Sequence, residues 1–153
     1  MSEQMETLLD FLVEAKRQTY ASGRNPEEGS RTDELTFTYE DGGNYTYHDG
    51  YIGAEKFIGQ EVILVQTKTV WGMNYYGAML VDAIPEEFSS FLKTALSLVS
   101  RDNPFRGPNT LVRGDFSYHS SWIGNLEQFR GEEYITFDNT RIYELFFHGG
   151  IIS

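Results

Sequence analysis

The 153-residue sequence contains no cysteine, which excludes disulfide bonds and thiolate metal sites. No stretch approaches the roughly 20 consecutive apolar residues of a membrane-spanning helix. The N-terminal residues lack the basic segment and the long apolar run of a secretory signal peptide. We therefore expect one soluble, cytoplasmic domain over residues 1–153, with no membrane partner.

Motifs that identify common chemistries are also missing. There is no HxH or HExxH spacing for a metal ion, no GxSxG for a serine nucleophile, and no P-loop or GxGxxG for a nucleotide phosphate. Lysine and arginine form no dense cluster, and the net charge of −11 repels a phosphate backbone. We expect no cofactor, no metal and no direct nucleic-acid binding.

Two segments have the apolar spacing of amphipathic helices. The first stripe runs from Met5 to Lys16, with Ser2 as a capping residue, and the second runs from Phe88 to Val99, with Pro85 expected in the first turn of its helix. Each helix contains FLxxA, and an Asn-Pro pair follows each one in a polar loop. The longer of these loops, residues 23–33, is the segment that we expect to be most mobile.

Alternation of apolar and polar residues predicts strands in the rest of the chain. The strands are separated by turns, of which Asp138-Asn139 has the pattern of a two-residue hairpin. Residues 41–44, DGGN, form another turn because glycine and asparagine accept a positive φ. Alignment of the chain with itself predicts a further turn at Gln66-Thr67.

The sequence contains a similar unit twice. Residues 45–53, YTYHDGYIG, resemble residues 116–124, FSYHSSWIG, and residues 55–77 align without a gap to residues 127–149 at an offset of 72. Such a repeat predicts a pseudo-symmetric fold. We expect an α+β fold made by internal duplication of an α-β-β-β-β unit. About eight antiparallel strands would form a curved sheet or an open barrel with two helices packed on it, in pseudo-repeat halves at roughly 4–80 and 84–150.

A concave face between the two halves is where a pocket would form. Our leading hypothesis is a small-molecule-binding domain without catalytic activity, because aromatic residues make up 15% of the chain and rings line ligand pockets. The expected wall residues are Tyr47, Tyr51, Trp71, Tyr75, Tyr118, Trp122 and Tyr143, and the expected polar contacts are Asn74, Tyr76, Arg106, His119 and His148.

Two other functions remain open. An enzyme could use Glu61 or Glu133 with a histidine as an acid–base pair, although solvated glutamates at the start of a strand are more common. The other function is that of a structural protein that forms a homodimer through an exposed edge strand.

Arg106 lies in a tight Phe-Arg-Gly-Pro loop. It could hold an anionic group or be an ordinary surface arginine.

Several strings together resemble a bacterial family of unknown function. They are FLVEAKRQTYA, EKFIGQEVI, WGMNYYG, PFRGP and YELFFHGG, and the resemblance covers nearly the whole chain. Members of that family are stand-alone proteins or modules behind an XRE-type helix-turn-helix, which implies a sensory, effector-binding role. This chain shows only one helix before its first predicted strand at Leu35, so we expect no helix-turn-helix at its N-terminus.

Overall fold

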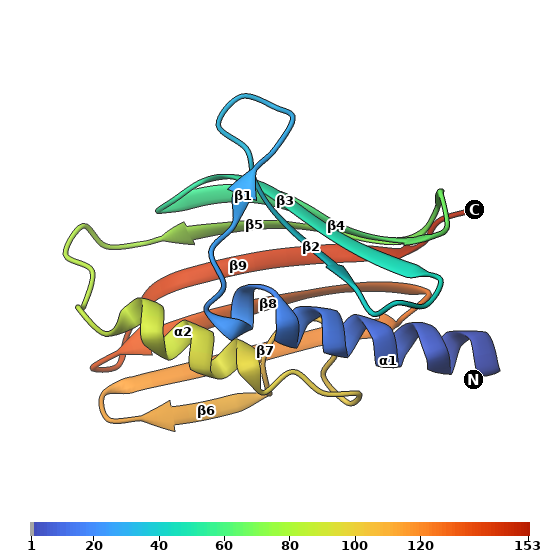
Figure 1. The fold of residues 1–153 in the computed structure, drawn as a ribbon. Helices are drawn as coiled ribbons and strands as arrows, with labels where there is room; N and C mark the ends of the chain where they lie inside the picture. Colours follow the sequence, from blue (N-terminus) through green and yellow to red (C-terminus); the bar gives the residue numbers. More distant parts are fainter. Residues whose placement is uncertain (1) are drawn as a thin grey trace.

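The computed structural model describes residues 2–153, which form two α-helices, one short 3₁₀ helix and nine strands (Figure 1). The expected α+β fold is confirmed, with nine strands instead of about eight. Within these residues no helix has the length and apolar character needed to cross a membrane. The elements in chain order are α1 Glu3–Gln18, η1 Tyr20–Ser22, β1 Glu27–Glu28, β2 Leu35–Glu40, β3 Tyr45–Gly53, β4 Lys56–Val65, β5 Lys68–Met79, α2 Phe88–Ser97, β6 Thr110–Arg113, β7 Phe116–Asn125, β8 Gln128–Phe137 and β9 Thr140–Ile151.

The strands form one antiparallel sheet in the order β1-β2-β3-β4-β5-β9-β8-β7-β6. It consists of two meanders, β2–β5 and β6–β9, which pair through β5 and β9. The sheet does not close into a barrel, because β1 and β6 lie at its two edges. Dimerisation through one of these short edge strands stays a prediction.

The two meanders have matching strand registers. At the centre of the β5–β9 pairing Tyr75 lies opposite Phe147, which is 72 positions later in the chain. The β4–β5 pairing shifts register after Ile63, and the β8–β9 pairing shifts after Ile135, again 72 positions later. Corresponding positions in the two halves therefore occupy equivalent places in the sheet.

The hairpin turns occur where the sequence predicts them. Asp138 and Asn139 form a two-residue turn with φ of 50° and 65°, the backbone of a type I′ hairpin. Gln66 and Thr67 join β4 to β5 in the first half, where Gln66 has a φ of 57°. The alignment of the chain with itself thus identified a turn that has no glycine.

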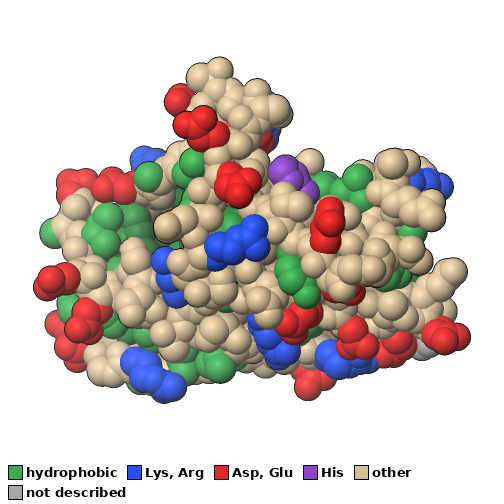
Figure 2. All heavy atoms as spheres, viewed as in Figure 1, with side chains coloured by type: hydrophobic (Ala, Val, Ile, Leu, Met, Phe, Trp, Pro, Cys, Tyr) green, Lys and Arg blue, Asp and Glu red, His purple; other side chains and the backbone are tan. Residues whose placement is uncertain are grey.

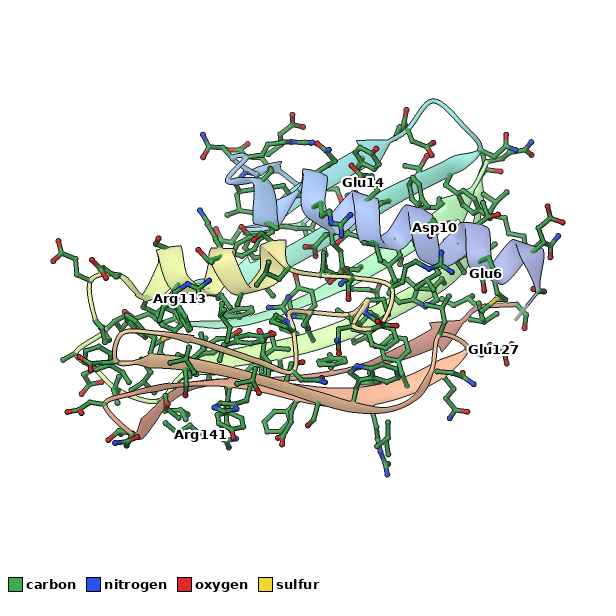
Figure 3. The ribbon with its side chains drawn as sticks, turned by 90° about the horizontal axis from the view of Figure 1, so that it is seen from below. Glu6, Asp10, Glu14, Arg113, Glu127 and Arg141 are labelled. Atoms are coloured by element: carbon green, nitrogen blue, oxygen red, sulfur yellow. The ribbon has the colours of Figure 1, made fainter. Side chains whose placement is uncertain are left out.

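Both helices cover the same face of the sheet, which we call the inner face (Figure 1). The Ser2 hydroxyl caps α1 by accepting a hydrogen bond from the Met5 amide, as predicted. The start of α2 differs from the prediction: Pro85 lies in the turn before the helix, which begins at Phe88. Glu6 and Asp10, labelled on α1 in Figure 3, both pair with Arg101 of the loop after α2 and so tie the two segments together.

The two loops that follow the helices take different paths. Residues 23–33 contain β1, and this part of the chain projects above the sheet edge, with acidic side chains on its surface (Figures 1 and 2). The loop after α2 instead turns inward, and its Phe105 side chain is only 1% exposed. This difference between the halves shapes the inner face.

Glycines that are present in both halves make room for aromatic rings that lie flat on the sheet. A Cβ on Gly59 would come within 2.3 Å of the Tyr75 ring, and one on Gly131 within 2.5 Å of Phe147. In the same way, Phe57 lies over Gly77, where an added Cβ would come within 2.3 Å of the Phe57 ring. Inner-face rings and cross-strand glycines are therefore complementary, which fixes the positions of these rings.

Candidate functional site

A cavity of about 350 Å³ lies between the two helices and the inner face of the first half. Its roof comes from α1, η1 and α2, and its floor from β3, β4 and β5. Most of its wall is aromatic or aliphatic, and a few buried charged groups project from the floor and the roof. The residues that define it include Lys16, Tyr20, Tyr47, Asp49, Tyr51, Phe57, Glu61, Tyr75, Leu92, Arg106 and Tyr143.

Glu61, on β4, is one of the buried charges and is only 2% exposed. Its carboxylate accepts a hydrogen bond from the Tyr47 hydroxyl at 2.7 Å and pairs with the Lys16 ammonium at 2.8 Å. Lys16 also donates to the backbone carbonyl of Phe105. Burial lowers the pKa of Lys16, although the charge of Glu61 opposes this shift. Lys16 therefore connects α1 to the sheet and to the inward loop.

Glu133 is the corresponding glutamate in the second half and is fully buried. Arg106 holds it by two hydrogen bonds, of 2.6 and 3.1 Å, and the hydroxyls of Tyr118 and Tyr143 also donate to it. Burial alone would raise the pKa of Glu133, but the positive charge and hydrogen bonds of Arg106, with those of the two tyrosines, keep it below its usual value. Glu133 is thus ionised and fully paired.

Asp49 differs from both glutamates. It is 7% exposed, and its carboxyl accepts a hydrogen bond of 2.6 Å from the Tyr75 hydroxyl. Within residues 2–153 it forms no ion pair. Burial and the neighbouring charge of Glu61 raise the pKa of Asp49 to about 7. This carboxyl in the cavity wall therefore changes its charge near neutral pH.

The equivalent space in the second half is filled by Phe105. Its ring stacks on Phe129 with centroids 3.7 Å apart and meets Trp122 edge-on at 5.0 Å. The ring of Phe147 lies 6.0 Å away. Because the loop after η1 points outward, no side chain from it takes this place in the first half, which leaves the cavity there.

The structure brings together five of the residues that the sequence analysis proposed. Tyr47, Tyr51, Tyr75, Arg106 and Tyr143 all line the cavity. Arg106 pairs with the buried Glu133 and its side chain is only 12% exposed, so the alternative of an ordinary surface arginine is wrong.

Three other predicted wall residues lie on the inner face but in the packed core beside the cavity. The Trp71 indole stacks on Phe129 and donates a hydrogen bond to the Leu126 carbonyl. Tyr118 is bonded to Glu133 and to the Gly107 amide, and Trp122 packs against Phe105. These rings support the cavity without lining it.

The four remaining predicted contacts lie on the opposite, outer face of the sheet. Asn74 and His148 are exposed and face each other across the β5–β9 pairing, with Tyr76 beside them at 47% exposure. His119 stacks on Tyr134 at 4.7 Å. The predicted site therefore combined residues from both faces of one sheet. Side chains alternate along a strand, so Tyr75 points inward and its neighbours Asn74 and Tyr76 point outward.

The outer face has a hollow of its own, of about 820 Å³, to which Asn74, Tyr76 and His148 contribute. It is broad and open, and its apolar residues Ile58 and Ile123 are 58% and 59% exposed. Small-molecule sites usually enclose most of the ligand. The smaller cavity under the helices, with its buried charges, fits that description better.

The Glu–His acid–base pair is not formed in this structure. Glu61 and Glu133 project from the inner face and are buried, which corrects the expectation that they are solvated. His48 and His119 project from the outer face, where they contact the hydroxyls of Thr38 and Ser117. The sheet itself separates the carboxylates from the imidazoles.

Asp49, Lys16 as a charged group, Tyr20 and Phe57 are among the cavity residues that sequence reasoning missed. The signal for Asp49 was present, because in Tyr47-His48-Asp49-Gly50-Tyr51 a period of two places it on the same face as the two tyrosines. Lys16 was already on the apolar stripe of α1. A charged residue on a buried stripe indicates a buried partner.

A family model described as "Domain of unknown function (DUF5680)" matches residues 49–152, and the chain belongs to this family. No match is found among curated proteins, and none among solved structures. The matched residues begin at Asp49 and include Glu61, Arg106 and Glu133, whereas α1 with Lys16 precedes them. The family match thus covers most of the floor of the cavity and α2, but not Tyr47 of β3 or the α1 and η1 parts of the roof.

Replacing Glu133 by glutamine should destabilise the protein by about 3–5 kcal/mol, because it leaves the Arg106 guanidinium buried without a counter-charge. Urea denaturation at pH 7 measures this difference. The matched control is Glu127→Gln, at an exposed position, which should change stability by no more than about 0.5 kcal/mol. Equal stabilities of the two variants would contradict the assigned ion pair.

Replacing Asp49 by asparagine should stabilise the protein at pH 8 relative to wild type, and less so at pH 5. The folded-state pKa of about 7 lies above the ordinary value of 3.8. Between pH 3.8 and pH 7 the Asp49 carboxyl is therefore protonated in the folded state and ionised in the unfolded state. Wild type therefore loses about 2–3 kcal/mol of stability between pH 5 and pH 8 because Asp49 ionises. The Asp49→Asn variant does not lose this contribution. Denaturation at both pH values tests this, with exposed Asp82→Asn as the control; a pH-independent difference would contradict the buried, ionising carboxyl.

Proposed function

We propose that the chain is a small-molecule-binding domain whose ligand occupies the cavity between the helices and the first half of the sheet. The observation that supports this most is a cavity of about 350 Å³ that combines an aromatic wall with buried charged groups. Binding sites for small molecules are typically concave and mostly apolar, with a few fixed polar groups. A volume of this size lies at the lower end of the usual range for such sites.

The rigidity of the polar groups also supports a binding role. Glu61 is held by Tyr47 and Lys16, and Glu133 by Arg106 and two tyrosines. Groups whose positions are fixed by such bonds need little reordering when a ligand arrives, which lowers the entropic cost of binding.

We also propose that the two halves arose by duplication and then diverged. The strand pairings and register shifts of the first half recur in the second half 72 positions later in the chain, which supports this origin. In this account Phe105 came to occupy the second half, while the first half kept its space for a ligand. The resemblance to modules behind a bacterial XRE-type helix-turn-helix supports a further proposal, that the bound molecule acts as an effector.

A thermal-shift screen of ring-containing metabolites tests the binding function, with a variant that narrows the cavity. Ser89 on α2 lines the cavity, and Ser90 beside it on the same helix does not. Hits should stabilise wild type and Ser90→Phe but not Ser89→Phe. A ligand at 100 times its Kd adds about 2.7 kcal/mol of stability, which corresponds to a Tm rise of about 5–10 °C for a chain of this length.

Two results would contradict the proposal. One is a screen in which no compound shifts the Tm of wild type. The other is a set of hits that stabilise the Ser89→Phe variant as much as wild type, since these would bind elsewhere on the protein.

A further inference from the structure

We infer that the ligand is an organic cation with a ring, such as a protonated arylalkylamine, whose ring occupies the first-half counterpart of the Phe105 position and whose cationic group pairs with Asp49. This inference rests on the proposed function and specifies its ligand class. It follows from a comparison of the two halves and from the distribution of charges around the cavity.

The second half shows what fits between these aromatic residues. The Phe105 ring lies among Trp122, Phe129 and Phe147. By register, their first-half counterparts are Tyr51, Phe57 and Tyr75, and all three line the cavity.

The arrangement of these rings is also alike in the two halves. Phe57 and Tyr75 have centroids 6.1 Å apart, and Phe129 and Phe147 have centroids 6.2 Å apart. The first half thus has the walls of a ring-sized site, while the second half has both walls and ring. A ligand ring in the first half would make the stacking and edge contacts that Phe105 makes in the second.

The charges around the cavity favour a cation over an anion. Each cationic side chain at the site already has a carboxylate partner, Lys16 with Glu61 and Arg106 with Glu133. Asp49 is the carboxylate at this site that forms no ion pair within the described residues. An ammonium group would neutralise it and form a charge-assisted hydrogen bond. An anion would have to compete with a buried glutamate for one of the two cations.

The position of Asp49 relative to the rings fits the same ligand. Its carboxyl is bonded to the Tyr75 hydroxyl at 2.6 Å, so it lies at the edge of that ring. The counterpart of Asp49 in the second half is Ser120, as their pairings with Glu61 and Glu133 show. The carboxylate is thus specific to the half that has the space. Tyr20 and Tyr51 also line the cavity, and tyrosine rings attract cations through their faces.

Binding of a cation should depend on pH through Asp49. The groups that face it are Tyr47 and Tyr51 on its own strand, Glu61 on β4, Tyr75 on β5, Lys16 on α1, and Arg106 in the loop after α2. Burial and Glu61 raise its pKa to about 7, while the Tyr75 hydrogen bond and the charges of Lys16 and Arg106 act in the opposite direction. At pH 6 about one carboxyl in ten is ionised, so affinity for a cation should fall about tenfold from its value at high pH.

Isothermal titration calorimetry with three indole probes tests the inference. Tryptamine is a cation, tryptophol is a neutral analogue with a hydroxyl in place of the ammonium, and indole-3-acetate is an anion. We expect wild type at pH 8 to bind tryptamine most tightly and indole-3-acetate most weakly. The tryptamine affinity should fall about tenfold at pH 6, whereas the tryptophol affinity should stay constant.

The Asp49→Asn variant separates the charge effect from the fold. It should bind tryptamine ten- to a hundredfold more weakly than wild type, because a hydrogen bond to a charged group is lost, and bind tryptophol about equally. The control Asp82→Asn, at an exposed position, should keep the wild-type preference. These variants retain the buried glutamates and their cations.

The outcomes distinguish the two claims. If the indole probes bind and indole-3-acetate is preferred, or if Asp49→Asn does not weaken tryptamine binding, the cation inference is wrong and the binding function stands. If no probe binds, the inference is overturned, and the metabolite screen with Ser89→Phe decides the binding function separately.

Discussion

The structure depends on two glutamates that are buried under the helices and must each be neutralised. Glu61 and Glu133 occupy equivalent positions on the inner face, and a buried carboxylate without a partner would cost several kcal/mol. Lys16 supplies one cation from α1, and Arg106 supplies the other from the loop after α2. These pairs fix where the helix and the loop lie on the sheet. They determine in turn where the space between them is filled and where it is left open.

The halves share their strand registers, their glycine–aromatic contacts and their buried glutamates, but they differ in how the inner face is covered. Lys16 reaches Glu61 and also the Phe105 carbonyl, so the contact that pairs the first glutamate helps to hold the loop of the second half. That loop places Phe105 among three rings, and the outward path of residues 23–33 leaves the corresponding rings free. A nearly symmetric sheet thus acquires one asymmetric cavity.

Much of the fold could be predicted from the sequence, because its signals are local. Helical spacing located both helices, glycine and asparagine marked the turns, and self-alignment identified the turn at Gln66-Thr67. The site was less predictable. Period two separates the faces of a strand, yet the predicted site grouped Tyr75 with Asn74 and Tyr76, which point the other way. Asp49 was overlooked although its spacing from Tyr47 placed it inside. The inward path of the Phe105 loop depends on long-range contacts with Lys16 and Phe129, and no local pattern indicates it.

The most direct test of this account is a crystal structure of the protein soaked with small aromatic compounds. We expect ring density between Phe57 and Tyr51 under α2, and superposition of the two halves should place that ring on the ring of Phe105. Density confined to the outer face, or an inner face in which side chains close the space between the helices and β3–β5, would contradict it.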